Sequence, residues 1–397
     1  MAQLSDRLNR LAPSATLAMS QKSNEMKAQG VDVINMSVGE PDFNTPDHIK
    51  EAGKKAIDDN FSKYSPVPGY MDLREAIVEK LKKENGLDYT TNEVIAGTGG
   101  KQGVCNTILA LVNPGDEVII PAPYWVSYPQ MAKLAGATPV IVRAGFEQDF
   151  KMTAEQLEAA ITPKTKMLIL CSPSNPTGSV YSQEELNALA EVILKHEDIF
   201  VLSDEIYEHI NYVGKAASIA SYPGMKERTI ICNGVSKAYA MTGWRLGWVA
   251  APAWIVKGIN KLQGQYTSGT CDVSQKAAVA AYVASQDCVE QMRVAFERRR
   301  DLIVKLAKDI PGLEVNVPQG AFYLFPKCSS FFGKSDGETV INNSTDFAMY
   351  ILEKAHVATV GGDAFGDPDC FRMSYATSDD NIREAMRRIK EVLAVLK

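Results

Sequence analysis

The middle of this chain of 397 residues alternates short β-rich segments with segments of helical apolar spacing, and this alternation restricts the possible folds most. Strands and helices that follow one another in this way form a mostly parallel sheet covered by helices. The predicted strands are 93–96, 117–121, 138–142, 167–170, 200–202, 229–232 and 245–249. The sequence therefore predicts an α/β fold built on a sheet of seven strands.

Helices are predicted between and before these strands. Residues 154–161 and 183–194 have helical apolar spacing, and Thr153 and Gln156 form a capping box at the start of the first. Residues 101–111 follow two glycines, and 72–84 begin with an acid and end in lysines before Gly86. These positions place helices in the connections of the parallel sheet.

The pattern changes beyond residue 290. A long charged helix containing 297–300 is followed by a predicted strand at 313–317, and a last helix begins at about Asp380. At 397 residues, the chain exceeds the size at which one hydrophobic core continues to grow. The composition change therefore marks a second domain. The stretch 333–338 is predicted to be an exposed loop.

Three predicted strands lead into polar residues. Asn175 follows the strand at 167–170, Asp204 follows 200–202, and Lys237 follows 229–232. A lysine amine reacts with carbonyls only when deprotonated, and a nearby Arg245 together with partial burial would lower its pKa. Taken singly, such a lysine is most often solvated at the surface and such an aspartate usually caps a helix, so each residue alone is weak evidence for a site.

Taken together, the residues fit one cofactor, pyridoxal phosphate. Asp204 offers a carboxylate for the pyridinium nitrogen, and Asn175 and Tyr207 offer hydrogen bonds to the phenolic oxygen. Lys237 offers an amine for the aldehyde, and Arg245 a guanidinium for the phosphate.

The chain resembles the fold-type I pyridoxal-phosphate aminotransferases of class I/II, and is most similar to bacterial aspartate aminotransferases. The matching segments are 13–16 (PSAT), 39–42 (GEPD), Tyr64, 99–102 (GGKQ), 123–125 (PYW), 175–178 (NPTG), 204–207 (DEIY), 236–237 (SK), 320–323 (GAFY) and 372–375 (RMSY). This resemblance implies a large domain with a mostly parallel seven-stranded sheet and a smaller α/β domain. It also implies that the strand after Lys237 is antiparallel.

The expected domain limits are an N-terminal arm with part of the small domain at 1–45, a large cofactor-binding domain at 46–290, and a small C-terminal domain at 291–397. The resemblance further implies a homodimer with shared active sites, because Tyr64 then reaches the cofactor phosphate of the other subunit.

The resemblance assigns Lys237 as the catalytic residue. The implied cofactor-binding residues are Gly99, Gly100, Lys101, Trp125, Asn175, Asp204, Tyr207, Ser236, Lys237, Arg245 and the partner's Tyr64. Trp125 is expected to stack on the pyridine ring, with core packing as the alternative. Many relatives carry a hydroxyl where this chain has Gly234, so a phosphate contact by Ser236 stays open.

The implied substrate-binding residues are Gly39, Trp125, Asn175, Arg372 and Lys101. Arg372 would hold the substrate α-carboxylate in a bidentate fork, although a strand-edge charge is the alternative. Segment 265–272 contains no arginine for a second carboxylate, and Lys101 takes that role in the bacterial branch. Relatives that use prephenate carry a basic residue where this chain has Ala12, which argues against that substrate.

The resemblance implies transfer of the amino group from L-aspartate to 2-oxoglutarate, giving oxaloacetate and L-glutamate. Two enzymatic alternatives stay open: an aminotransferase with broader specificity for aromatic, alanine or prephenate substrates, and a pyridoxal-phosphate lyase or decarboxylase of the same fold. A non-enzymatic regulator of this fold would carry an added DNA-binding domain, for which this chain has no sequence.

Charge and cysteine content restrict partners and location. The net charge of −6 disfavours nucleic acid and membrane surfaces as partners and favours small-molecule substrates. The first ten residues lack the apolar core of a secretory signal, and no apolar run reaches the length of a membrane span. The seven scattered cysteines predict reduced thiols in a cytoplasmic protein, and the four histidines lack metal-binding spacing. No metal is expected.

Overall fold

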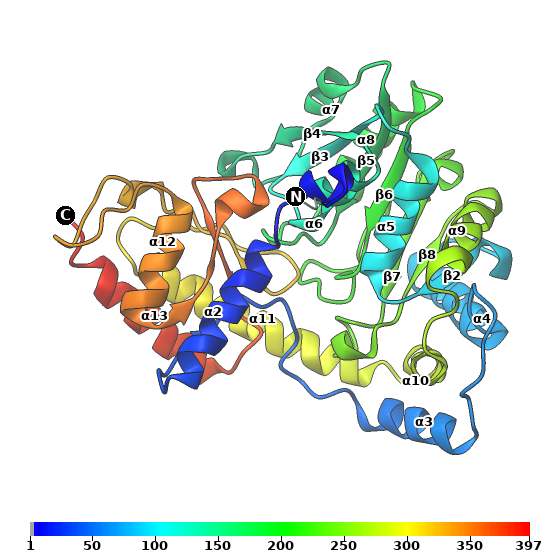
Figure 1. Ribbon diagram of the computed structural model, residues 1–397, viewed down its shortest axis with the longest axis horizontal. Coiled ribbons are helices and arrows are strands. Elements are labelled where there is room, and N and C mark those ends of the chain that lie inside the picture. Colours follow the sequence, from blue (N-terminus) through cyan, green and yellow to red (C-terminus); the bar gives the residue numbers. More distant parts are fainter. Residues whose placement is uncertain (1–3) are drawn as a thin grey trace.

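A twisted sheet of seven strands forms the centre of the computed structural model, which describes residues 4–397 (Figure 1). The strands are ordered β2, β8, β7, β6, β5, β3, β4. Their bounds are β2 Val94–Gly97, β3 Glu117–Ala122, β4 Thr138–Arg143, β5 Thr165–Cys171, β6 Phe200–Asp204, β7 Thr229–Gly234 and β8 Gly247–Ala250. Each lies within two residues of its predicted limits, which confirms the seven predicted strands.

Only β8 departs from the parallel arrangement. It runs antiparallel to β2 and to β7, whereas the other neighbours in the sheet are parallel. The antiparallel strand expected after Lys237 is therefore confirmed. Parallel strands β5, β6 and β7 end together, with Cys171 beside Asp204 and Asp204 beside Cys232.

Helices pack against both faces of the sheet because successive strand residues point to opposite faces. Val118 and Ile120 of β3 belong to a hydrophobic cluster with α5, α6 and α9, whereas Ile119 between them packs with α7 and α8. Helices α3, α4 and α10 pack together beside β2 and β8. The helix bounds are α3 Asp47–Asp58, α4 Met71–Lys80, α5 Gly100–Leu111, α6 Ser127–Leu134, α7 Ala154–Ala160, α8 Gln183–Leu194, α9 Ala253–Tyr266 and α10 Asp272–Val283.

The predicted helices are confirmed, with one local difference. The capping box of α7 is present, since the Gln156 N–H donates to Thr153 Oγ1 and the Thr153 N–H donates to Gln156 Oε1. The helix predicted at 72–84 is α4, which continues as a π-helical turn, Leu81–Asn85. That turn ends where Gly86 takes a left-handed conformation, with φ of 72°.

Helix α1 Asp6–Asn9 contacts α6 beside the seven-stranded sheet, and the other elements form a second layered unit. The helices of this unit are α2 Ala15–Ala28, α11 Asp287–Lys308, α12 Ser344–Tyr350 and α13 Asp379–Leu393, and its short strands are β1 Ile34–Asn35, β9 Tyr323–Leu324, β10 Val357–Ala358, β11 Val360–Gly361 and β12 Phe371–Ser374. The long charged helix and the last helix are thus confirmed. Figure 1 shows the blue α2 among the yellow to red elements α11, α12 and α13.

Chain segments from both ends meet in this unit. Strand β1 pairs in parallel with β10, placing Ile34 beside Val357. Ile34 and Met36 also share a hydrophobic cluster with residues of α11 and α13. The domain limits 1–45, 46–290 and 291–397 stay our proposal.

The prediction of a strand at 313–317 is wrong. Glu314 forms only an isolated antiparallel bridge with Lys327. The amide of Asn316 instead donates to the Phe146 carbonyl and to Asp149, and Val317 is exposed. Because this segment has no neighbouring strand to extend the bridge, it lacks a ladder of backbone hydrogen bonds.

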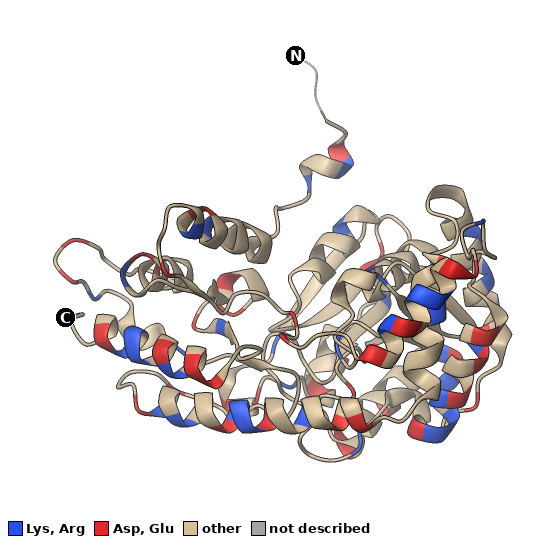
Figure 2. Ribbon diagram, turned by 90° about the horizontal axis from the view of Figure 1, so that it is seen from below, with Lys and Arg blue, Asp and Glu red and all other residues tan. Residues whose placement is uncertain are grey.

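Charged side chains of both signs are interspersed over the outer helices (Figure 2). On α11, for example, Arg293 pairs with Glu290 and Glu297 within the same helix. Among residues 4–397, no helix is long and apolar enough to cross a membrane.

Candidate active site

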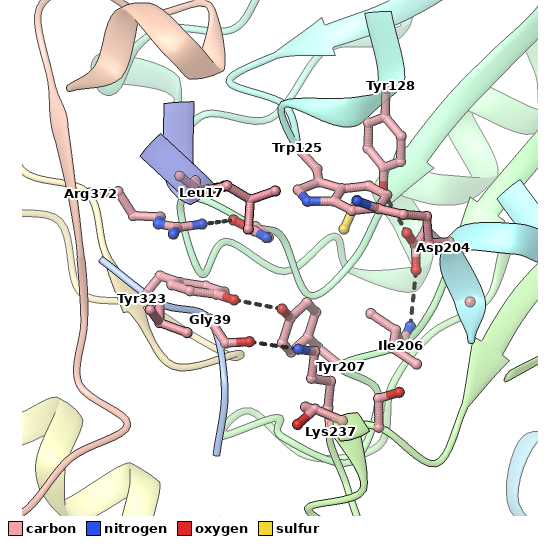
Figure 3. Close-up of a pocket in the computed structure, with 18 of the residues that line it drawn as sticks. Leu17, Gly39, Trp125, Tyr128, Asp204, Ile206, Tyr207, Lys237, Tyr323 and Arg372 are labelled. Atoms are coloured by element: carbon pink, nitrogen blue, oxygen red, sulfur yellow. Dashed lines mark hydrogen bonds between the residues drawn. The ribbon is translucent and has the colours of Figure 1, made fainter. Parts of the chain in front are cut away.

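A cavity of about 370 Å³ lies at the carboxyl ends of β5, β6 and β7 (Figure 3). Crevices at this edge of an open α/β sheet are common ligand sites. Eleven of the residues predicted for the site line it: Gly39, Gly100, Lys101, Trp125, Asn175, Asp204, Tyr207, Ser236, Lys237, Arg245 and Arg372. The fold therefore brings most of the predicted residues to one cavity.

Two predicted residues do not line the cavity. Gly99 lies just behind Arg245, and a Cβ atom added to Gly99 would lie 2.3 Å from Arg245 Nη2. Tyr64 has a relative exposure of 101 %, so it makes no contribution to the cavity of its own chain.

Lys237 enters the cavity from the loop after β7. Its Nζ donates a hydrogen bond of 2.6 Å to the Gly39 carbonyl, as Figure 3 shows. Burial lowers the pKa of this amine to about 8, Glu40 opposes that shift, and Arg372 and Arg245 add to it. The expected depression is present, with burial as its main cause. Near neutral pH the amine is therefore available in both its charged and its neutral form.

Asp204 ends β6 on the opposite side of the cavity. Tyr128 donates a hydrogen bond of 2.6 Å to Asp204 Oδ2, and the Ile206 N–H donates to Oδ1 at 3.3 Å. Burial raises the pKa of this carboxyl, while Tyr128, Ile206 and Lys237 lower it. A cationic N–H group bound at Asp204 would relieve the cost of burying its charge.

Arg372 of β12 presents a buried guanidinium to the cavity. Nη1 donates to Asn175 Oδ1 at 2.8 Å and Nη2 donates to the Ser37 carbonyl at 2.5 Å, but the buried Nε has no partner among residues 4–397. The rings of Tyr323 and Phe365 lie 4.6 and 4.8 Å from its Cζ. The fixed, incompletely paired guanidinium suits an anionic ligand.

A second anion site is formed where α5 begins. The backbone N–H groups in the first turn of α5, including those of Gly100 and Lys101, have no acceptor within the helix, and both residues line the cavity. Arg245 is held beside it, with Nη1 donating to the Thr242 carbonyl at 2.8 Å and Nη2 donating to the Thr98 carbonyl at 3.3 Å. The arrangement fits a phosphate group.

Lys101 lies at the solvent-open side of the cavity. Its Nζ is 4.9 Å from the centre of the Trp125 ring, and it makes no ion pair with any residue among 4–397. Loss of hydration and the charge of Arg245 lower its pKa. A ligand carboxylate could pair with this ammonium.

The cavity also contains residues that sequence reasoning missed. Tyr128 supports Asp204, and the Tyr323 hydroxyl lies 2.7 Å from that of Tyr207. Both tyrosines lay close to recognised motifs, since Tyr128 is one helical turn beyond Trp125 and Tyr323 ends the segment 320–323. The other lining residues that were missed are Thr16, Leu17, Ser20, Ser37, Val38, Cys171, Ile206 and Thr242.

Comparison with known proteins agrees with this geometry. The family model described as aminotransferase class I and II matches residues 31–389. An aspartate/prephenate aminotransferase of Cereibacter sphaeroides is 49% identical over 399 residues, covering 100% of both chains. The crystal structure of the aspartate aminotransferase from Rhizobium meliloti has a TM-score of 0.97 at 42% identity, covering 100% of both chains. The aspartate aminotransferase of Thermus thermophilus with maleate has a TM-score of 0.93 at 40% identity, covering 99% of this chain and 100% of that one.

Proposed function

This chain belongs to the class I and II aminotransferase family, and on that premise we propose that it transfers the amino group of L-aspartate to 2-oxoglutarate. The products would be oxaloacetate and L-glutamate. The observation that carries this proposal is the single cavity that joins the Lys237 amine to the Asp204 carboxyl and the Arg372 guanidinium. The similar proteins from Cereibacter sphaeroides and Rhizobium meliloti are named as an aspartate/prephenate aminotransferase and an aspartate aminotransferase, which also supports the proposal.

The cavity residues fit pyridoxal 5'-phosphate. Asp204 would hold the ring nitrogen, since its buried carboxyl lacks a full cationic partner, and the Trp125 ring would cover one face. The anion site at Gly100 and Arg245 would hold the phosphate, with Ser236 next to Lys237. When bound, pyridoxal phosphate draws electrons away from the substrate Cα and so makes its proton acidic.

Lys237 would hold the reactive aldehyde and move the proton. Its Nζ can accept the proton from the substrate Cα when neutral and return it when charged. A pKa of about 8 keeps both forms populated near neutral pH. The bond to Gly39 keeps this atom inside the cavity when it is free.

Arg372 would bind the substrate α-carboxylate. The guanidinium lies close to the rings of Tyr323 and Phe365, and its Nε has no partner among residues 4–397, so it favours a planar anion. The backbone of Gly39 can approach the same carboxylate, because a Cβ here would lie 2.1 Å from the Tyr323 hydroxyl.

Lys101 would bind the second carboxylate of aspartate. It is a lysine without an ion pair in the described chain, and its ammonium lies against Trp125 at the cavity mouth. The similar Thermus thermophilus enzyme is described with maleate, which is a dicarboxylate. Both observations support an acidic donor.

Prephenate is a second candidate substrate, because the Cereibacter sphaeroides relative is named for both activities. Ala12, where prephenate-using enzymes carry a basic residue, donates its backbone N–H to Gln130 Oε1 at 2.9 Å. Its methyl side chain offers no charge for a further carboxylate. We therefore expect weak prephenate turnover that increases in Ala12→Lys.

We also propose a cytoplasmic homodimer. All seven cysteines are free thiols, which suits a reducing compartment. The exposure of Tyr64 suits a residue that acts in the partner's site.

A panel of amino donors with 2-oxoglutarate tests the function. Aspartate should be the best donor, with glutamate as the second product, and Lys237→Ala should reduce kcat by at least about 1,000-fold. Borohydride reduction followed by peptide mapping should locate the cofactor on Lys237. Release of pyruvate or ammonia in place of amino transfer would favour the lyase alternative, and label on another lysine would contradict the site.

A further inference from the structure

A buried ion pair lies beside the cavity without lining it. Lys80, the last residue of α4, and Glu208, which follows Tyr207, have relative exposures of 4 % and 7 %. The Lys80 ammonium donates to Glu208 and lies 3.5 Å from Glu84. Although burial opposes it, the charges of Lys80 and His209 lower the pKa of Glu208 to about 2. Glu208 is therefore ionised throughout the working pH range.

Two asparagine side chains also donate to this carboxylate. Asn85 Nδ2 donates to Oε2 at 2.8 Å from the π-helical turn, and Asn233 Nδ2 donates to Oε1 at 2.7 Å from β7. Of the two asparagines, only Asn233 belongs to the strand whose following loop carries Lys237. With its NH2 group bound to Glu208, its Oδ1 is oriented to accept the Gly234 N–H at 2.7 Å.

Gly234 is the last residue of β7, and the loop that begins there carries Lys237. A Cβ at Gly234 would lie 2.7 Å from the Gly247 Cα atom, so the strand end is packed against β8 without free space. Rotation of the Gly234 peptide would change the direction of the loop. The hydrogen bond that the Gly234 N–H donates to Asn233 Oδ1 opposes that rotation.

We propose that Glu208 and Asn233 are positioning residues that fix the Gly234 peptide and thereby direct Lys237 into the cavity. A buried ion pair adds little net stability compared with apolar residues of similar size. What this pair provides is a fixed carboxylate, which holds the Asn233 amide in one orientation. The inference rests on the proposed function in one respect, that Lys237 is the amine that binds pyridoxal phosphate.

Asn233→Ala and Asn85→Ala form a matched pair for the test. Each removes one amide that donates to the same carboxylate, and only the first also removes the acceptor of the Gly234 N–H. The primary readout is the association rate of pyridoxal phosphate with the cofactor-free protein across pH 6 to 10. Thermal unfolding of each cofactor-free variant reports general destabilisation.

In the unmodified protein the rate should rise through a midpoint near pH 8, where the Lys237 amine loses its proton. Asn233→Ala should lower the plateau rate at least about 10-fold, because a misdirected nucleophile reacts slowly. Asn85→Ala should stay within about 2-fold of the unmodified rate. Glu208→Gln keeps an oxygen that can accept from Asn233 and should stay close to the unmodified rate.

Equal association rates for the two alanine variants would overturn the proposal, as would a loss in Asn233→Ala that appears only in its melting temperature. If Asn233→Ala does not fold, Asn233→Ser replaces it, because serine is too short to join Glu208 to Gly234. Failure of the unmodified protein to bind pyridoxal phosphate at Lys237 would instead refute the proposed function.

Discussion

At the scale of single residues, the Asp204 carboxyl depends on the hydroxyl of Tyr128. Burial raises the pKa of Asp204, and the bond from Tyr128 is the largest effect that lowers it. A hydrogen bond to a buried charge contributes about 1.5 to 3 kcal/mol. Removing the hydroxyl should therefore leave Asp204 less ready to carry the negative charge that a protonated ring nitrogen needs.

Tyr128→Phe should lower kcat/KM for aspartate by roughly 10-fold, which corresponds to about 1.4 kcal/mol. Steady-state kinetics with 2-oxoglutarate measures the change. Tyr222→Phe is the control, because Tyr222 also donates to a carboxylate, that of Glu191, but at the surface. Equal kcat/KM values in the two variants would exclude a special role for Tyr128.

Lys101 should determine the preference for acidic donors. Lys101→Met should reduce kcat/KM for aspartate about 30-fold, through loss of one charged hydrogen bond, and that for phenylalanine by less than about 3-fold. Lys166→Met is the control, since the Lys166 ammonium also lies over an aromatic ring, 5.3 Å from the centre of Phe200, at the start of β5. Similar losses for both donors would assign Lys101 to the cofactor or to α5.

The lowered pKa of Lys237 has a consequence for stability. The native amine has a pKa of about 8 and the unfolded one a pKa of 10.5. Between these values the unfolded state binds more protons, so the free energy of unfolding rises with pH. Below pH 8 the cost of burying the charge is present in full, and above pH 10.5 it is absent.

In the cofactor-free protein, the free energy of unfolding of Lys237→Met should therefore exceed that of the unmodified chain most below pH 8. Its advantage should decrease by up to about 3 kcal/mol between pH 8 and 10.5. Urea unfolding at several pH values measures the difference in free energy of unfolding between the two proteins. The contributions of the other titrating groups are common to both and cancel. A difference that does not change with pH would mean that the native amine keeps its ordinary pKa.

Sequence reasoning singled out residues whose chemistry is visible in the chain. Lys237, Asp204 and Arg372 carry reactive or charged groups within short motifs, and the structure places all three at one cavity. It failed for Tyr128, because a buried tyrosine on a helix can face the core or a ligand. Its direction follows from the packing of α6 against β3 and β4, which pattern alone does not give.

At the scale of elements, the start of β8 sets the position of the anion site. A Cβ at Gly247 would lie 2.2 Å from the Gly100 N atom and 2.5 Å from the Gly99 carbonyl carbon. These are backbone atoms of the turn that opens α5. A methyl group here must displace the turn or the strand.

Gly247→Ala should therefore weaken pyridoxal phosphate binding by at least about 10-fold and lower stability by roughly 1 to 3 kcal/mol. Fluorescence titration of the cofactor-free protein and thermal unfolding measure these two effects. Gly258→Ala in α9 is the control, since a Cβ there meets no atom within 4 Å, and it should be neutral or stabilising by up to about 1 kcal/mol. Unchanged cofactor affinity in Gly247→Ala would show that the turn tolerates displacement.

Elements were predictable where many residues share one pattern. Strands such as β7, which is buried along its whole length, appear in the sequence as continuous apolar runs. Segment 313–317 instead alternates apolar and polar residues, which is also typical of a strand, but it lacks a partner strand, and that depends on distant residues. The π-helical turn after α4 was not predicted, because it includes Asn85, whose amide donates to Glu208, a residue far along the chain.

At the scale of the whole molecule, the single chain leaves its cavity open beside Lys101 and Arg245, and Tyr64 is fully exposed. A homodimer related by a two-fold axis would complete both sites in the same way. Each site would then use Lys237 from one subunit and Tyr64 from the other.

Mixed dimers test this arrangement. Subunits carrying Tyr64→Ala and subunits carrying Lys237→Ala should each have low activity alone. In a mixed dimer both defects fall in one site and the other site is intact, so the dimer should recover up to about half of the activity of the unmodified dimer. Verified mixed dimers without recovery would contradict shared sites. Mixed dimers of Lys237→Ala with Lys166→Met subunits are the reference, because they contain one site in which both Lys237 and Tyr64 are present.

The pairing of β1 with β10 also bears on how the protein is made. Ile34 leaves the ribosome long before Val357, its neighbour in the finished sheet. At synthesis rates of about 5 to 20 residues per second, the early segment waits roughly 20 to 60 s for its partner. The seven-stranded sheet has all its strands by residue 250 and can assemble during this interval. The apolar residues of the early segment stay uncovered meanwhile, which makes the nascent chain a client for chaperones until its last hundred residues emerge.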